Sequence, residues 1–307
     1  MYLYTLNYQE EVDFIKAQID NLIEYLYTKN KFFVSTENEN NDNMNKVRFS
    51  YKGEVKEPKN KFKLYLSVII YKIIINNFMN TKLKKYLKNN YMYLNYNDYA
   101  EIENMYKDIL LNEEYEIDDD SIFFINTKNY IINIIVNYFD EYDELNIEGF
   151  IKFRSKKIDD ELEVAVNKLV ERFMIEKEYN EFIKLLKYFV EMQENKLDEV
   201  HILVEKNGEY LIKNKYGEDI LELFSTGLNT LECTEIIKAE DLIISGLITQ
   251  CPKYVFVYGT ENALNTEILD TIKKVFEDRA FFYKYNYFKP LKNYAKNKEY
   301  LVDNKFN

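Results

Sequence analysis

Glycine and proline are scarce in this chain, which holds 7 glycines and 3 prolines among its 307 residues. These two residue types are the strongest local breakers of regular structure. A chain with so few of them favours long helices over a loop-rich β sandwich. Apolar residues make up 47% of the chain, and its length is sufficient for two or three compact units with buried cores.

Hydrophobic periodicity changes twice along the chain and indicates three regions. Residues 1–57 mix helical and alternating patterns, residues 58–196 are almost entirely helical in pattern, and residues 197–307 return to a mixture. We therefore predict an α+β fold. It has a mostly helical core, a small N-terminal α/β layer and a C-terminal α/β unit.

The two outer regions contain recognisable strands and turns. In the first, strands are expected on both sides of an Asn- and Glu-rich loop, Glu37–Asn45. Within the helical region, Asp140–Glu144 is expected to be an acidic connector. In the third, Lys206-Asn207-Gly208 is a strong hairpin signal. The continuous apolar run Tyr254–Tyr258 lies between two helical patterns, which predicts a parallel strand buried on both faces.

Charge is unevenly distributed. The net charge of −12 argues against general nucleic-acid binding, which needs a concentrated positive face. Yet Lys59–Asn97 contains eight lysines and no acidic residue. Three interpretations are open: a core helix with a solvated basic end, a docking site for an acidic partner, or a helix on an anionic membrane surface. The segment is apolar nearly all round up to Ile75, which favours the core helix. The exposed patch that remains, and that would dock a partner, comprises Lys82, Lys84, Lys85 and Lys88.

The chain shows no sign of export or of a zinc site. Its two cysteines, Cys233 and Cys251, form no CxxC pair, and with a single histidine they do not supply the ligands of a structural zinc ion. The first residues, Met1-Tyr2-Leu3-Tyr4-Thr5-Leu6, have no basic region and no long apolar run, so we expect no secretory signal. The best span candidate, Leu64–Phe78, is interrupted by Lys72 and two asparagines. We expect a cytoplasmic protein without a transmembrane segment or a cofactor; contact with a membrane surface is the less favoured possibility.

Three short blocks carry a family resemblance. They are Glu148-Gly149-Phe150-x-x-Phe153-Arg154, the helical stretch Tyr179–Val190, and Asp198-Glu199-Val200-His201. Together they resemble the YtxC family, a set of putative sporulation proteins of endospore-forming bacteria, most closely over Asn146–Val204. The resemblance implies a cytoplasmic protein with a role in spore formation. It implies no catalytic residues, substrate or cofactor.

The polar residues within these blocks are the candidate catalytic residues: Glu148, Arg154 and His201. A guanidinium binds an anion through two parallel hydrogen bonds, and a carboxylate with an imidazole can carry out acid–base chemistry. The structural interpretation is favoured, however. Arg154 would pair with Asp159 or Glu148, and His201, in an apolar strand, would be a hydrogen-bonded core residue.

Two loops are candidate ligand sites. Gly259-Thr260-Glu261-Asn262 follows a buried strand, where an anion can bind, but it lacks a phosphate-binding fingerprint and Glu261 would repel a phosphate. Asp118-Asp119-Asp120 offers oxygen ligands for magnesium, but adjacent residues in one loop rarely point at one ion, and a helix N-terminal cap already explains them. We therefore expect no nucleotide site and no metal site.

The leading functional hypothesis is a non-catalytic cytoplasmic sporulation protein that acts through contacts with a protein whose identity the sequence does not give. The alternative is an enzyme or a small-ligand protein that binds an anion or nucleotide. Its site would lie between the helical and C-terminal regions.

Overall fold

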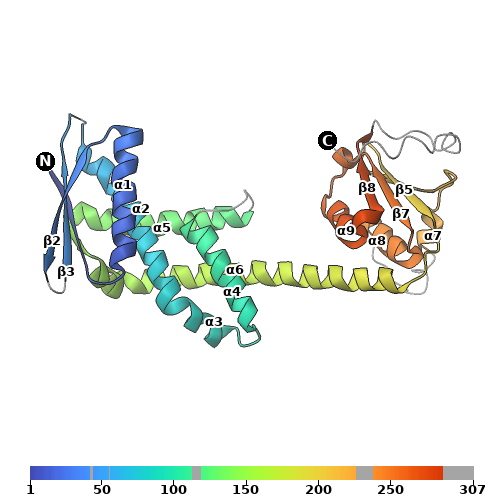
Figure 1. Cartoon of the computed structure of the whole chain (residues 1–307), viewed down its shortest axis with the longest axis horizontal. Coiled ribbons are helices and arrows are strands. Elements are labelled where there is room, and N and C mark those ends of the chain that lie inside the picture. The colour runs from blue at the N-terminus through green and yellow to red at the C-terminus, as the bar shows by residue number, and fades with distance from the viewer. Residues whose placement is uncertain (42–43, 55, 113–118, 226–237, 286–307) are drawn as a thin grey trace. The chain divides into compact units, whose positions relative to one another are not determined.

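The computed structural model describes residues 1–41, 44–54, 56–112, 119–225 and 238–285. It contains two mixed sheets of four strands each among many helices, which confirms the α+β prediction. The chain divides into two compact units, Met1–Ile175 and Glu176–Asn307, coloured blue to green and yellow to red in Figure 1. The division into three regions stays a prediction.

The sheet of the first unit has the strand order β2-β3-β1-β4. Its central strand β1 (Tyr2–Tyr8) pairs antiparallel with β3 (Met44–Tyr51) and parallel with β4 (Glu144–Asn146). Strand β2 (Val34–Asn41) pairs only with β3 and so forms one edge. Residues 140–144, expected to be a connector, also contain the end of α5 at Glu141 and the start of β4 at Glu144.

The expected loop Glu37–Asn45 is mostly strand, which corrects the sequence prediction. β2 continues to Asn41 and β3 starts at Met44, with an unbroken register between them. Asn and Glu have low strand propensity, but cross-strand pairs offset it. Glu39 and Arg48, for example, form an ion pair at 2.7 Å.

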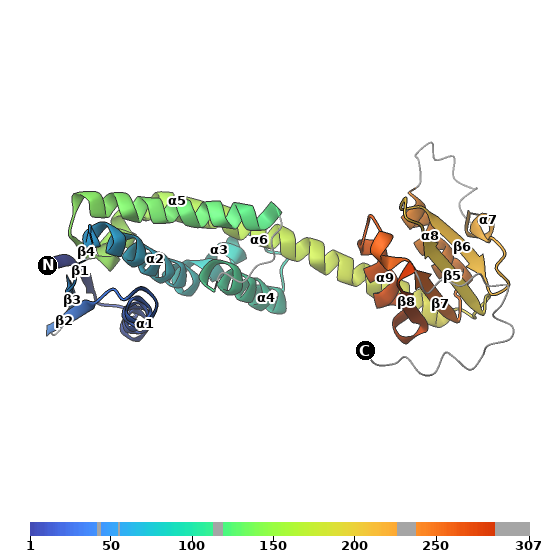
Figure 2. The same cartoon turned by 90° about the horizontal axis from the view of Figure 1, so that it is seen from above.

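The helices of the first unit form one core with its sheet. Buried apolar side chains from Leu3 to Phe173 belong to a single cluster. Helix α2 packs against α1 and α5 (Figure 2). The elements are α1 (Val12–Asn30), α2 (Pro58–Phe78), a π-helical turn η1 (Met79–Leu83), α3 (Lys84–Asn90), α4 (Tyr96–Tyr106), a second π-helical turn η2 (Lys107–Leu111) and α5 (Asp119–Glu141).

Helix α2 is buried on most of its surface, as expected for an apolar core helix. Its buried residues include Phe62, Leu66, Ile70 and Ile74, whereas Leu64 is 55% exposed. By length and composition alone, the continuous helical run Pro58–Asn90 qualifies as a membrane-spanning helix, but 61% of its most apolar window is buried inside the protein. Core helices pass the same test, so the run is weak evidence for a span.

The sheet of the second unit has the order β6-β5-β7-β8. Strand β7 (Tyr254–Tyr258) pairs parallel with both β5 (Glu199–Val204) and β8 (Ala280–Tyr283), and β6 (Tyr210–Asn214) completes the hairpin with β5. Side chains of β7 enter two separate apolar clusters on opposite faces, which confirms a parallel strand buried on both faces. The described part of this unit also contains α7 (Leu221–Ser225), α8 (Ala239–Gln250) and α9 (Glu267–Phe276).

Helix α6 (Ile147–Met192) is 46 residues long and contributes to both units. Its first part supplies buried residues such as Leu162, Val166 and Leu169 to the core of the first unit. Its last part supplies Ile183, Leu186 and Val190 to the core of the second.

Candidate functional site

Glu148 lies in the first turn of α6, where its carboxylate holds the connection between β1 and α1. One carboxylate oxygen, Oε1, accepts hydrogen bonds from the backbone N–H groups of Gln9 (2.6 Å) and Glu10 (2.9 Å). Asn146 also binds the start of α6, since its side-chain oxygen accepts from the N–H of Gly149 at 2.6 Å. A Cβ atom on Gly149 would lie 2.8 Å from that oxygen. The first family-like block therefore joins β1, β4 and α6.

Arg154 does not pair with either expected partner. Its side chain is exposed and makes no ion pair or hydrogen bond with any residue that the structure describes. Asp159 pairs instead with Lys82, at 2.6 Å. Burial is the largest cause that raises the pKa of Tyr138, and the nearby Tyr142 raises it further. The positive charge of Arg154 opposes that rise. Arg154 is thus an exposed cation near Tyr138.

His201 is in the middle of β5, in the second unit, and only 2% exposed. Its Nδ1 lies 3.3 Å from the Tyr258 hydroxyl, and its Nε2 lies 3.4 Å from Oε2 of Glu199. The ring stacks on Phe256, with 4.9 Å between centroids. Burial lowers the pKa of His201, and the bond to Glu199 partly opposes this effect. His201 is a hydrogen-bonded core histidine.

The three candidate catalytic residues are divided between the two compact units. Glu148 and Arg154 belong to the first unit and His201 to the second. None of them lines either of the two grooves described below. Their catalytic role stays a prediction.

The four lysines of the predicted docking patch differ in whether they form an ion pair with a described residue. Lys82 forms the ion pair with Asp159. Lys84, Lys85 and Lys88 are exposed on α3 and have no ionic partner within the described ranges. Three of the four predicted docking residues are therefore available to a partner.

The two loops considered as ligand sites use their polar groups internally. The Glu261 carboxylate accepts a hydrogen bond from the N–H of Tyr285 at 2.9 Å, and the Asn262 amide donates to the Val204 carbonyl at 3.1 Å. Gly259 has φ +75°, and a Cβ there would lie 2.3 Å from the Val204 carbonyl oxygen. This loop is built as a tight strand-to-helix turn.

The acidic cluster before α5 is only partly described. Asp118 lies outside the described residues, and Asp120 pairs with Lys168 at 3.1 Å. Among the residues whose placement is described, no group of three or more histidine, cysteine, aspartate or glutamate side chains is arranged to hold a metal ion.

The second unit contains a groove of about 520 Å³ between α6, α8 and α9. Phe182 and Phe189 of α6 form one wall, and Ile244, Ile248 and Ile268 contribute apolar side chains from α8 and α9. Three carboxylates line it as well, from Glu240, Asp241 and Glu267. The groove offers apolar contact area with a negatively charged rim.

An exposed apolar stripe runs along α6 beside this groove. It comprises Phe182, Leu185, Phe189 and Met192, which are 49%, 57%, 51% and 69% exposed. The sequence alone does not tell which apolar face of this helix is buried. The structure assigns the interior to Ile183, Leu186 and Val190 and leaves the stripe in solvent.

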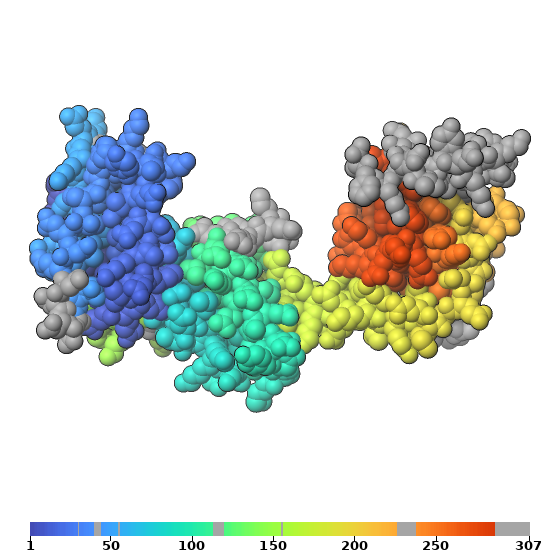
Figure 3. Space-filling model, viewed as in Figure 1, coloured from blue at the N-terminus to red at the C-terminus, as the bar shows by residue number. Residues whose placement is uncertain are grey.

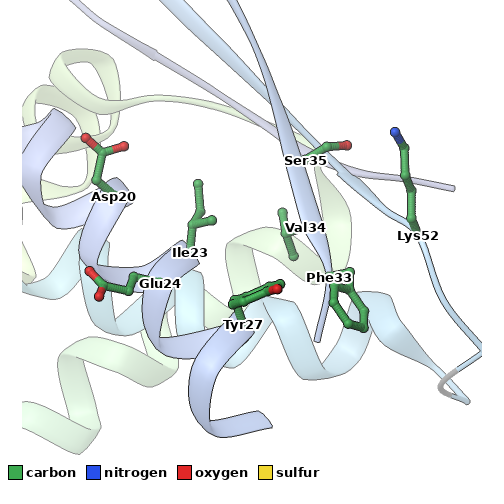
Figure 4. A pocket seen from close by; sticks show the side chains of 8 residues that line it. All are labelled: Asp20, Ile23, Glu24, Tyr27, Phe33, Val34, Ser35 and Lys52. Atoms are coloured by element: carbon green, nitrogen blue, oxygen red, sulfur yellow. The ribbon is translucent and has the colours of Figure 1, made fainter. Parts of the chain in front are cut away.

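A second groove, of about 450 Å³, lies in the first unit between α1 and the edge strand β2 (Figure 4). Ile23 and Tyr27 of α1 face Val34 and Phe33 across it. Asp20 and Glu24 extend from the helix, and Ser35 and Lys52 from the strand side. Sequence reasoning missed this groove, because it depends on which edge of the sheet α1 covers.

The comparisons with known proteins identify a family without defining its chemistry. The YtxC-like family model matches residues 64–280, which is most of the chain. No curated protein and no solved structure matches the chain. On the strength of the family match, this chain belongs to the YtxC-like family.

Proposed function

We propose that this chain is a cytoplasmic sporulation protein that acts through protein–protein contacts rather than through catalysis. Membership of the YtxC-like family supports the link to sporulation. The observation that carries the proposal is the exposed stripe on α6, comprising Phe182, Leu185, Phe189 and Met192.

The spacing of the stripe suits a partner helix. Its members follow one another at intervals of three, four and three residues, the pattern of the seam in a coiled coil. Large exposed apolar patches on a protein surface typically mark interaction sites. Two stripe residues, Phe182 and Phe189, also line the groove against α8 and α9. Apolar side chains from an amphipathic partner helix would fill that groove.

The charges around the groove disfavour the alternative, a site for an anion or nucleotide. Glu240, Asp241 and Glu267 would repel a phosphate. The same carboxylates would attract basic side chains that flank the apolar face of a partner helix.

The test replaces the apolar side chains of the stripe and measures both the binding of partner proteins and spore formation. We expect Phe182→Ser, Leu185→Ser and Phe189→Ser, combined in one chain, to reduce in-cell cross-linking to partners in a sporulating, endospore-forming host and to lower spore yield. The control is Phe153→Ser, because Phe153 is 84% exposed on the same helix but outside the stripe. Circular dichroism checks the fold of both variants, and cell fractionation checks the cytoplasmic location.

Unchanged cross-linking and unchanged spore yield in the folded stripe variant would reject the proposal. An equal loss in the Phe153→Ser control would show that any exposed apolar residue on α6 has the same effect, and would reject the stripe as the contact surface.

A further inference from the structure

We propose that the outer edge of β2, together with the groove between β2 and α1, binds an extended basic segment of a partner protein by strand addition. This surface lies in the first unit, whereas the α6 stripe lies in the second. The inference therefore stands or falls independently of the proposed function.

The outer edge of β2 presents backbone groups that no other strand binds. The N–H of Lys52 donates to the Phe33 carbonyl at 3.0 Å, so Phe33 faces β3, and the N–H of Tyr51 points away from β2 to the Met1 carbonyl at 2.8 Å. Hydrogen bonding alternates along an antiparallel pair. The N–H and C=O groups of Val34, Thr36 and Asn38 therefore point outward, and they have no hydrogen-bond partner among the described residues.

This edge lacks most of the features that prevent pairing with another chain. Proteins usually protect edge strands with proline, lysine, a bulge or a short length. Strand β2 is eight residues long, contains neither proline nor lysine, and keeps a regular register with β3. Its remaining protection is the negative charge of the exposed Glu37, since Glu39 is paired with Arg48.

The groove supplies side-chain contacts beside this edge. An added strand would direct every second side chain toward α1, against Ile23, Tyr27 and Val34. Figure 4 shows these residues on the two sides of the groove, and Figure 3 shows α1 in dark blue on the viewed surface.

Charge defines the occupant. Asp20 and Glu24 on the α1 side are exposed and have no ionic partner within the described part of the chain. Together with Glu37 they outnumber Lys52, the cation that lines the groove, whereas Glu39 is paired with Arg48 at 2.7 Å. A complementary strand therefore alternates apolar, preferably β-branched, residues with lysine or arginine.

The same charges argue against a second copy of this chain as the occupant. Antiparallel pairing of two β2 strands would place the Glu37 side chains of both copies near one another. Like charges on neighbouring strands destabilise a sheet. A basic segment of another protein meets no such repulsion.

The experiment selects octapeptides from a random display library on the full-length chain, with the Thr36→Pro variant as the counter-selection. Proline at Thr36 removes an outward-pointing donor and is tolerated on an edge strand. We expect enrichment of basic peptides with alternating β-branched residues on the wild-type chain only. Thr36→Val is the matched control, because it retains the backbone N–H group.

The leading peptide is then synthesised with a fluorescent label and measured by anisotropy. We expect Asp20→Lys combined with Glu24→Lys to weaken its binding by about tenfold or more, because two attractive charges become repulsive. A peptide with glutamate in place of lysine should bind the wild-type chain no better than background. In amide hydrogen exchange, bound peptide should slow the N–H groups of Val34, Thr36 and Asn38.

Three results would overturn the inference. The first is equal enrichment on the Thr36→Pro and wild-type chains. The second is binding that is unaffected by the Asp20 and Glu24 substitutions. The third is a dimer in sedimentation that Thr36→Pro dissociates, because the edge would then belong to a second copy.

Discussion

The two ends of α6 show how one helix serves two purposes. In the first unit, Leu162, Val166 and Leu169 are fully buried, and the helix is a core element. In the second unit the helix is apolar on two faces, but only Ile183, Leu186 and Val190 are covered. The other face, with Leu185 and Phe189, remains more than half exposed. Apolar composition alone therefore does not distinguish packing residues from contact residues; the neighbouring elements do.

The largest effect on stability is expected when two leucines of this helix are compared. Leu162→Ala should lower the free energy of unfolding by about 2–5 kcal/mol, because it leaves a cavity in a packed core. Leu185→Ala, at a 57% exposed position, should change it by less than about 0.5 kcal/mol. Urea unfolding followed by circular dichroism measures both. Similar losses for the two variants would contradict the division of α6 into a core part and a contact part.

The next effect tests whether Glu148 is a structural residue. Glu148→Ala removes the acceptor of two backbone hydrogen bonds from Gln9 and Glu10. It should cost about 1.5–3 kcal/mol of stability, the range for hydrogen bonds to charged groups. Arg154→Ala should be almost neutral, since Arg154 is exposed and has no ionic partner in the described structure. Thermal unfolding of the two variants and of Glu148→Gln measures the difference; a more costly Arg154→Ala would contradict this assignment.

A smaller effect concerns the second unit alone and depends on pH. Because burial lowers the pKa of His201 in the folded state, the unfolded chain binds a proton first as pH falls below about 6.5. Stability should therefore be highest above that pH and decrease from there toward the folded pKa, by at most about 1.4 kcal/mol per pH unit. Unfolding at pH 7.5 and 5.5, with His201→Gln as control, measures the contribution. An equal pH dependence in the variant would exclude His201 as its source.

The smallest effect on stability is expected at the lysine patch. Replacing Lys84, Lys85 and Lys88 with glutamate should change the free energy of unfolding by less than about 0.5 kcal/mol, because these side chains are exposed. The same variant should recover less of an acidic partner in pull-downs from sporulating cells. Lys82 is left in place, since its loss would unpair Asp159. Undiminished recovery would remove this patch as a docking surface.

The sequence predicted the elements whose signals are local. The apolar run of β7, the hairpin at Lys206-Asn207-Gly208 and the buried helix α2 all follow from periodicity or turn chemistry. Strand β4 was missed because its three residues form a strand only by pairing with β1, about 140 residues away. The end of β2 was missed because its Asn and Glu residues have low strand propensity and depend on β3.

The site was harder to predict than the fold. The sequence drew attention to Glu148, but its partners are backbone N–H groups of Gln9 and Glu10, which carry no side-chain signal. The α6 stripe was not predicted, because its exposure depends on which face of the helix the second unit covers. The groove beside β2 depends on the packing of α1 against an edge, so no local pattern marks it.

The π-helical turn η1 has a consequence for how the length of this protein can vary. Phe78 and Leu83 are both buried although they are five residues apart, one more than regular helical spacing allows. The wide turn Met79–Leu83 accommodates the additional residue and keeps Lys82 out of the interior. Deleting Thr81 would leave a regular helix with the same side chains facing inward. Within Pro58–Asn90, this turn is therefore the place where one residue can be lost while the buried side chains on both sides of it still face the core. A deletion in the regular helix before or after the turn would rotate every later side chain away from its present direction.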